Sequence, residues 1–427
     1  MDATTGVRGR PGPPDDAPPP PSDAVAPVGD GLAVVGSATA AGVPGPAVVE
    51  IGSEETRFAE FVLGAVVLLA VPVPGAPGGF LVGQVALLVL IGLSFFRRPT
   101  RSMDALSWLP YACAAMLGYL VLVSVTGPDL SLFGWPKRAL RLALVLTALV
   151  VMVSGRVHFP SLVRGMAAGL LGNAVLFFAG VAPAPYGRFL SGYLLDKNQA
   201  GLAYTVVGIL LVGVTSGRRR QAAVLLVTSA LVWTTGSRTS LAALGCALVW
   251  FLLRPRLNVP GRLALAAVFA LVLPFVEERY AQVGEFADRV GTDAFRARID
   301  AASLAKLDHA PWHGQGLGEA WAMLPEGATY FFHNSYWAML VEGGWVYLVA
   351  VLVVTVWFGI RPLRPGPPPT LFARSAEAAN LAVLVCALRL GEVFGATTAV
   401  VALAAGLIGY LQAESLRSSA GAATVSR

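Results

Sequence analysis

Long apolar stretches separated by short polar ones repeat along this sequence from about residue 58 onward. Most approach the ~20 residues that a helix needs to cross a bilayer, and inside lipid runs of this length are helical. The pattern predicts an all-α integral membrane protein with about twelve transmembrane helices. The predicted spans are 58–74, 80–96, 106–125, 139–154, 161–182, 199–215, 221–236, 239–253, 263–276, 335–359, 376–391 and 394–412.

The composition agrees with a membrane protein and argues against a soluble globular one. Hydrophobic residues make up 56% of the chain and charged residues 13%, and the mean hydropathy is +0.67. The 3 cysteines lie inside apolar runs without a CxxC motif, so neither a disulfide framework nor a zinc site is indicated. The pI is about 9.4, but the basic residues form no single patch, so no nucleic-acid partner is expected.

The arginines in alternate loops predict the orientation. If the N-terminus is cytoplasmic, every short loop on that side is basic, as the positive-inside rule requires. These arginines are Arg97, Arg98, Arg101, Arg156, Arg164, Arg218, Arg219, Arg220, Arg254, Arg256, Arg262, Arg361, Arg364 and Arg374. Both termini are then cytoplasmic, and one long extracytoplasmic loop spans residues 277–332.

Three regions follow from this pattern. Residues 1–55 are rich in proline, glycine and aspartate and predict a disordered cytoplasmic tail, whose role stays open. Residues 56–415 form a polytopic membrane domain, and residues 416–427 form a cytoplasmic C-terminal tail.

Two arginines on the predicted outer side are candidates for binding an anion. Arg238 lies in a tight turn, "TTGSRTSLAAL", on the side where the positive-inside rule disfavours arginine. Its planar guanidinium suits a phosphate or a carboxylate, although it could simply mark the end of a span. Arg298 opens "RIDAASLAKL", which predicts an amphipathic helix along the membrane interface. In the alternative reading, Arg296 and Arg298 form the solvated face of that helix.

His333 is the candidate general base. It lies beside Asn334 at the head of the tenth predicted span, "HNSYWAMLVEGGWVYL". Histidine changes charge near neutral pH and can take a proton from a hydroxyl group, while a helix N-terminus favours an anion. The alternative is an interface histidine that caps the span with Asn334 or Ser335.

Glu342 lies inside the same predicted span and needs a partner if it is buried. Arg389 and Glu392, at the outer end of the next span, are possible companions. The glycines of the bend at 314–318 predict a turn in which backbone approaches another part of the chain closely.

The ordered set of these stretches resembles the O-antigen ligase and O-antigen polymerase superfamily of bacterial membrane glycosyltransferases. The resemblance covers about residues 190–350 and rests on four motifs. They are "DKN" at 196–198, "SRT" at 237–239, the Arg298 segment that runs into "GQGLG", and "HNSYWAMLVEGG" at 333–344.

The resemblance implies a fold like that of C-type glycosyltransferases. It also implies transfer of a glycan from an undecaprenyl diphosphate carrier to a hydroxyl of a glycan, lipid or protein acceptor. Transfer would take place on the outer face of the cytoplasmic membrane, without a nucleotide, metal or other cofactor. The acceptor, the sugar, and the choice between ligase and polymerase stay open.

The resemblance also suggests roles for single residues. His333 would be catalytic, and the substrate-binding residues would be Arg238, Arg298, Lys197, Asn198, Asn334 and Glu342. Family members often read His-Pro followed by Gly-x-Gly, whereas this chain reads "HAPWHGQGLG". The roles of His309 and His313 are therefore open. Pro311 between them also argues against a shared helical face that could bind zinc.

A secondary transporter with twelve helices is the alternative function. Transporters usually carry internal repeats and bind their substrate at the membrane midplane. This sequence shows no such repeat, and its polar residues gather at one predicted face.

Overall fold

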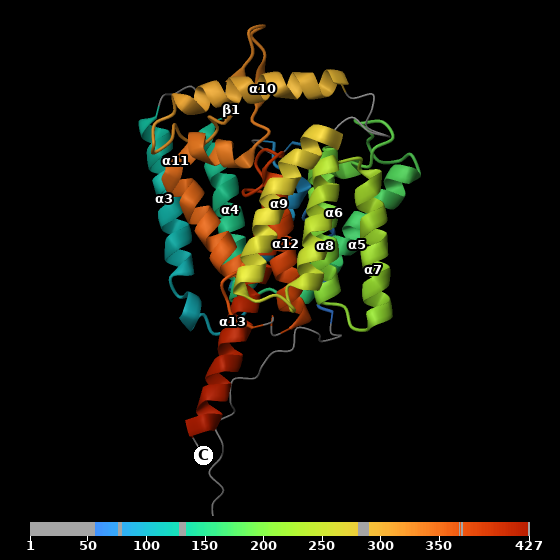
Figure 1. The fold of residues 1–427 in the computed structure, drawn as a ribbon, viewed down its shortest axis with the longest axis vertical. Coiled ribbons are helices and arrows are strands. Elements are labelled where there is room, and N and C mark those ends of the chain that lie inside the picture. Colours follow the sequence, from blue (N-terminus) through green and yellow to red (C-terminus); the bar gives the residue numbers. More distant parts are fainter. Residues whose placement is uncertain are drawn as a thin grey trace, which may run out of the picture. The chain divides into compact units, whose positions relative to one another are not determined.

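The computed structural model describes residues 56–75, 79–127, 134–280, 290–366, 368 and 370–425. The predicted N-terminal tail lies outside these residues. The chain is predominantly helical, as predicted, and one two-stranded antiparallel hairpin interrupts the helices (Figure 1). The helices are α1 (Phe58–Val66), α2 (Val82–Phe95), α3 (Leu109–Thr126), α4 (Trp135–Val153), α5 (Phe159–Phe178), α6 (Lys197–Gly213), α7 (Arg218–Thr234), α8 (Arg238–Leu253), α9 (Val259–Tyr280), α10 (Val290–Asp308), α11 (Ser335–Val354), α12 (Leu371–Ala387) and α13 (Thr397–Val425), and the strands are β1 (Trp321–Met323) and β2 (Thr329–Phe331).

A helix lies in each of the twelve predicted spans, and α10 contains the segment predicted to be amphipathic. Figure 1 shows α10 lying across the ends of the other helices, with the β1–β2 hairpin beside it. Four described helical segments are long and apolar enough to cross a membrane. They are Asp104–Thr126, Phe159–Phe178, Ser335–Ile360 and Thr397–Ser418.

The first helix is shorter than the predicted span 58–74, since α1 ends at Val66. Pro72 and Pro74 follow, and a proline disfavours helical backbone at the residue before it. The chain after α1 is extended instead, and Pro72 pairs with Leu81 in an isolated bridge. Non-helical backbone inside a membrane protein is tolerated where protein buries it or where it lines a cavity.

Helix α12 is the central helix of the bundle and packs against α6, α8 and α13. A buried ionic cluster at its start joins two of the arginine-rich loops. Glu377, only 1% exposed, lies 2.9 Å from Arg254 Nε and 3.2 Å from an Arg361 guanidinium nitrogen. Arg254 and Arg262 also donate to the Gly366 carbonyl oxygen, at 2.9 and 2.7 Å. The α8–α9 and α11–α12 loops therefore lie at the same end of the helices.

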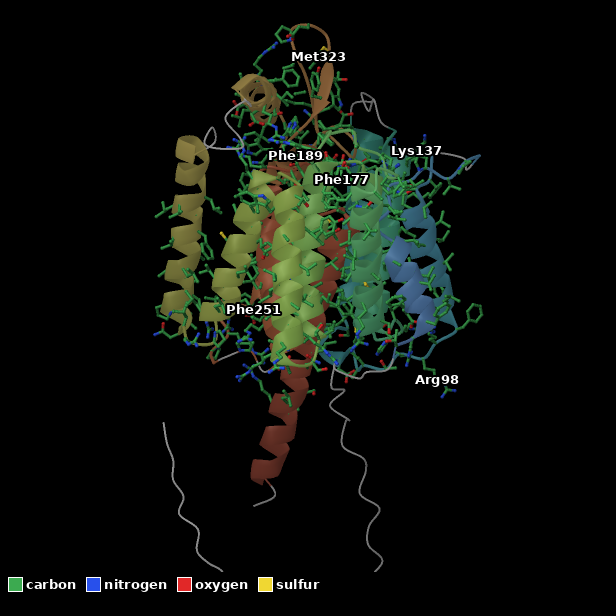
Figure 2. All side chains as sticks on the ribbon, turned by 90° about the vertical axis from the view of Figure 1, so that its right-hand side faces the viewer. Arg98, Lys137, Phe177, Phe189, Phe251 and Met323 are labelled. Carbon is green, nitrogen blue, oxygen red and sulfur yellow. The ribbon has the colours of Figure 1, made fainter. Side chains whose placement is uncertain are left out.

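The basic loop that follows α2 lies at one end of the bundle (Figure 2). In Figure 2, Arg98 lies at one end, and Lys137, Phe189 and Met323 lie at the other. Arg101 of the α2–α3 loop donates to the Met152 carbonyl oxygen at 3.0 Å, so this basic loop packs against the end of α4. The orientation of the basic loops in the membrane stays a prediction.

Candidate functional site

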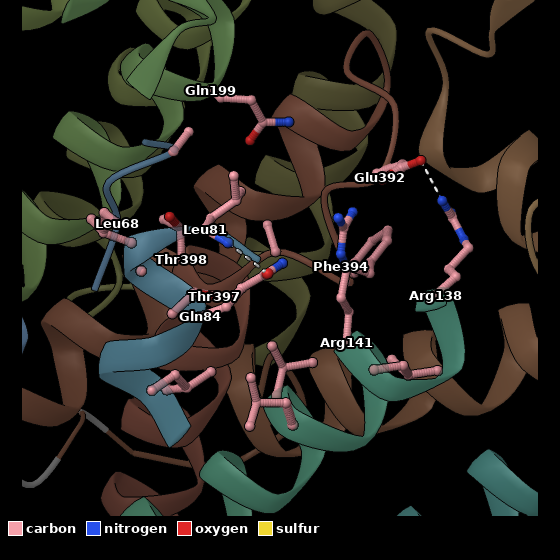
Figure 3. Close-up of a pocket in the computed structure, with 18 of the residues that line it drawn as sticks. Leu68, Leu81, Gln84, Arg138, Arg141, Gln199, Glu392, Phe394, Thr397 and Thr398 are labelled. Carbon is pink, nitrogen blue, oxygen red and sulfur yellow. Dashed lines mark hydrogen bonds and ion pairs between the residues drawn. The ribbon is translucent and has the colours of Figure 1, made fainter. Parts of the chain in front are cut away.

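Two adjoining cavities lie at the end of the bundle that α10 crosses. The larger, of about 760 Å³, is lined by His333 and is called the histidine cavity. The smaller, of about 330 Å³, is lined by the first turn of α13 and is called the α13 cavity (Figure 3). Arg138, Arg141, Gln199 and Glu392 line both cavities, which are therefore adjacent.

The histidine cavity is strongly cationic. Its charged lining residues are the cations Lys137, Arg138, Arg141, Arg296 and Arg389 and the carboxylates Asp196 and Glu392. Guanidinium groups bind phosphate through two parallel hydrogen bonds, and several of them can balance a multiply charged anion. The lining therefore suits a phosphorylated ligand.

The half-buried His333 faces this cationic space. Its imidazole has no hydrogen-bond partner among the described residues, and its Nδ1 atom is buried. Burial lowers the pKa of His333 and the charge of Arg296 lowers it further, whereas Asp300 and Asp196 raise it. A lowered pKa keeps the imidazole neutral near pH 7, which is the form that can accept a proton.

The backbone on either side of His333 is held by hydrogen bonds. Phe332 N–H donates to the Ala320 carbonyl oxygen at 3.1 Å, directly after strand β2. The Asn334 side chain accepts hydrogen bonds from the backbone N–H groups of Tyr336 and Trp337, at 2.9 and 3.3 Å. Asn334 is thus the N-cap of α11, one of the roles that the sequence suggested for it.

Helix α11 is broken at Gly344, where φ is +64° and a Cβ atom would lie 2.0 Å from the Trp312 carbonyl oxygen. The break frees backbone groups that the preceding glycine-rich bend satisfies. Gln315 N–H donates to the Val341 carbonyl oxygen at 2.6 Å, and Trp345 N–H donates to that of Trp312 at 3.0 Å. This is the close backbone approach that the glycines at 314–318 predict.

Glu342 lies at this break and is only 3% exposed. One carboxylate oxygen accepts a hydrogen bond from Gly318 N–H at 3.0 Å, and the carboxylate lies 2.9 Å from the Arg138 guanidinium. Arg138 also pairs with Glu392, the residue predicted as a possible companion of Glu342. The buried carboxylate thus fixes Arg138 of α4 at the wall between the two cavities.

The structure brings some of the predicted site residues together and separates others. Asn198 lines the histidine cavity with His333, and Glu342 lines the α13 cavity. Arg238, Arg298 and Lys197 are not among the residues that line either cavity. The substrate-binding roles suggested for them stay predictions.

Arg298 lies on the surface, 50% exposed, and pairs with Glu326 of the hairpin loop. Arg238 is the first residue of α8, and Ser237 is the N-cap. The Lys197 ammonium group lies over the Phe189 ring, 4.7 Å from its centroid. Each of these cations thus already interacts with other groups of the protein.

The sequence analysis missed Lys137, Arg138 and Arg141. They stand in "WPKRALRLAL" at the start of a span whose beginning lies on the predicted outer side, where the positive-inside rule disfavours basic residues. Arg138 and Arg141 are three residues apart, so they share one face of α4. This local violation of the rule was the signal that could have identified them.

The described residues contain no group of three or more His, Cys, Asp or Glu side chains arranged to hold a metal ion. His309 Nδ1 lies 2.8 Å from the Ala305 carbonyl oxygen of its own helix, α10. The carbonyl oxygen of His313 accepts a hydrogen bond from the Tyr119 hydroxyl at 3.0 Å.

The fold and the site define a helical membrane protein with a cationic, histidine-containing cavity at one end. Residues 222–352 match the family model described as O-Antigen ligase, which confirms the family resemblance. Of the four motifs, "DKN" at 196–198 lies outside the matched segment. The matched segment runs from α7 to α11 and contains Arg238, Arg298, His333 and Glu342. No curated protein matches the chain.

Replacing Glu342 by glutamine should destabilise the protein, because it removes the charge that holds Arg138 and leaves the hydrogen bond from Gly318 possible. Arg138 keeps Glu392, so we expect a loss of about 2 kcal/mol, below the ~3–5 kcal/mol for a fully orphaned buried charge. Thermal unfolding in detergent, followed by tryptophan fluorescence, measures the change.

The matched control is Glu326→Gln, which breaks the exposed pair with Arg298 and should leave the unfolding temperature unchanged. An equal effect of both substitutions would mean that the buried pair does not stabilise the break in α11.

Proposed function

We propose that this protein is a membrane glycosyltransferase of the O-antigen ligase or polymerase type. It transfers a glycan from an undecaprenyl diphosphate carrier to an acceptor hydroxyl during assembly of a cell-surface polysaccharide. The family match at residues 222–352 supports this type of enzyme. The observation that carries the proposal is a half-buried histidine, without a hydrogen-bond partner among the described residues, in a cavity lined by five cations.

The cavity chemistry fits a direct displacement. His333 accepts the proton of the acceptor hydroxyl while its oxygen bonds to the anomeric carbon of the glycan. The bond between that carbon and the diphosphate oxygen breaks, and the electron pair leaves with the diphosphate. Guanidinium groups such as those of Arg141 and Arg296 stabilise the charge of the leaving group without a metal ion. This displacement inverts the configuration at the anomeric carbon.

The distribution of basic loops supports a site on the extracytoplasmic side. In Figure 2, Arg98 and Phe251, near the end of α8, lie at the end opposite to Lys137, which lines the histidine cavity. The positive-inside rule expects the arginine-rich loops at that end to be cytoplasmic. Multi-pass topology with both termini in the cytoplasm is part of the proposal. The carrier's diphosphate would then meet the cavity at the outer membrane face.

We expect purified wild-type protein in nanodiscs to transfer glycan from undecaprenyl diphosphate-linked oligosaccharide, with EDTA present. His333→Ala should lower the rate by about 10²–10⁴-fold, because it removes the general base. His309→Ala is the matched control, since this histidine bonds to its own helix and should have little effect. A ladder of products would indicate a polymerase, and a single added unit a ligase.

A fully active His333→Ala protein would overturn the assignment of the base. If wild-type protein gave no product with any of a panel of acceptors, the result would favour transport instead.

The neighbouring arginines of α10 provide a second test. Arg296 lines the histidine cavity, whereas Arg298, two residues further, pairs with Glu326 at the surface. Arg296→Ala should therefore lower transfer by about tenfold or more, as loss of a charge-assisted hydrogen bond does, and Arg298→Ala should lower it much less. The opposite order would support the role that the family resemblance suggests for Arg298.

The pH dependence of transfer should report on His333. Its pKa lies below the ordinary value of 6.5, and only the neutral imidazole accepts a proton. The value of kcat/KM should therefore be constant near pH 7 and fall as the pH drops through the lowered pKa. Asp300→Asn removes a charge that raises the pKa, so it should shift the acid limb to still lower pH. An unshifted acid limb in this variant would argue that another group titrates.

A further inference from the structure

The α13 cavity joins Arg141, which the transfer step uses, to polar groups of α13 that have no role in that step. Extended backbone after α1 and the start of α2 form one wall, and residues of α4, α6, α11 and α13 contribute to the others. In Figure 3, Arg141 from α4 and Gln84 from α2 extend into one space, beside Thr397 and Thr398. Leucine and valine side chains line the remainder, among them Leu68.

The first turn of α13 faces this cavity. The Ala396 carbonyl oxygen accepts a hydrogen bond from Val400 N–H at 3.2 Å, so Thr397, Thr398 and Ala399 form the first helical turn. The backbone N–H groups of such a turn have no acceptor within their own helix, and they carry the positive end of the helix dipole. Among the described residues, no side chain caps them.

The Thr398 side chain is a second, independent sign of a ligand. It is only 6% exposed and lines the cavity, yet its hydroxyl group has no hydrogen-bond partner in the described parts of the chain. The hydroxyl oxygen is not one of the fully buried unpartnered atoms, so it opens onto the cavity, where it can donate a hydrogen bond to a ligand.

The cation at this site is Arg141. Its neighbour Arg138 forms ion pairs with Glu342 and Glu392, whereas Arg141 has no ion pair within the described ranges. Together the two cavities are lined by five cations and by three carboxylates, one of them Asp196. The side chains that line the two cavities therefore have a net positive charge, which favours binding of an anion.

We propose that the α13 cavity holds the diphosphate leaving group of the carrier lipid, bound by the first turn of α13, by the Thr398 hydroxyl and by Arg141. The inference rests on the proposed function and adds the place where the departing anion binds. Helix N-termini bind phosphate through their free N–H groups, and arginine adds a charge-assisted hydrogen bond. The apolar part of the lining, such as Leu68 and Leu87, suits the first units of the carrier chain.

The test is a binding measurement that does not need turnover. Farnesyl diphosphate, a short prenyl diphosphate, is titrated calorimetrically into the full chain in nanodiscs. Thr398→Val keeps the side-chain volume and should weaken binding about fivefold, and Arg141→Gln should weaken it more than tenfold. Thr398→Ser, which restores the hydroxyl, should bind as the wild type does. Thr147→Val is the matched control, because the Thr147 hydroxyl bonds to its own helix at Ala143.

A titration with inorganic pyrophosphate in place of the prenyl compound distinguishes a site for the carrier lipid from a site for free diphosphate. Weaker binding of pyrophosphate supports a site for the carrier, and equally tight binding overturns that assignment. Unchanged farnesyl diphosphate affinity in both Thr398→Val and Arg141→Gln overturns the inference, and the transfer assay of the same samples shows whether the proposed function survives. Binding that depends on both residues in a protein without transfer would support the anion site and overturn the proposed function.

Discussion

The ion pair between Glu342 and Arg138 is the interaction on which the site depends. A carboxylate inside a helix that is otherwise apolar is costly unless it is paired and hydrogen-bonded. Glu342 has both, from the guanidinium of α4 and from Gly318 N–H. The same contacts join three parts of the chain: α4, the glycine-rich bend, and α11 at its break. They also place Arg138 where it meets Glu392, at the wall shared by the two cavities.

Charge is handled differently at the two ends of the helical bundle. At the end where α12 begins, the buried Arg254 and Arg361 pair with Glu377. Arg254 and the buried Arg262 also donate hydrogen bonds to a carbonyl oxygen. At the opposite end, Arg141 and Arg296 line open space instead of a closed cluster. The first arrangement holds loops together, because its charges are satisfied inside the protein. The second leaves positive charge available to a ligand, which is what phosphate chemistry needs.

The backbone on both sides of His333 is fixed, which defines where its side chain enters the cavity. Strand β2 ends just before it and the Asn334 cap of α11 begins just after it. Both elements restrict the backbone, and α10 crosses above with Arg296 facing the same cavity. The amphipathic helix thus has two arginines with different surroundings. Arg298 points to the hairpin loop, and its partner Glu326 makes it a surface contact.

The sequence by itself determined the helices, their approximate limits, the basic loops and the candidacy of His333. These features depend on local composition and on the length that a membrane imposes, so they can be read from neighbouring residues. It also indicated Asn334 as a possible cap and a close approach at 314–318, because capping and glycine turns are local. Only the tertiary structure decided that Arg138 and Arg141 line the site while Arg298 does not. Their distance from His333 along the chain is large, and contact between them depends on how α4, α10 and α11 pack, which no local pattern encodes.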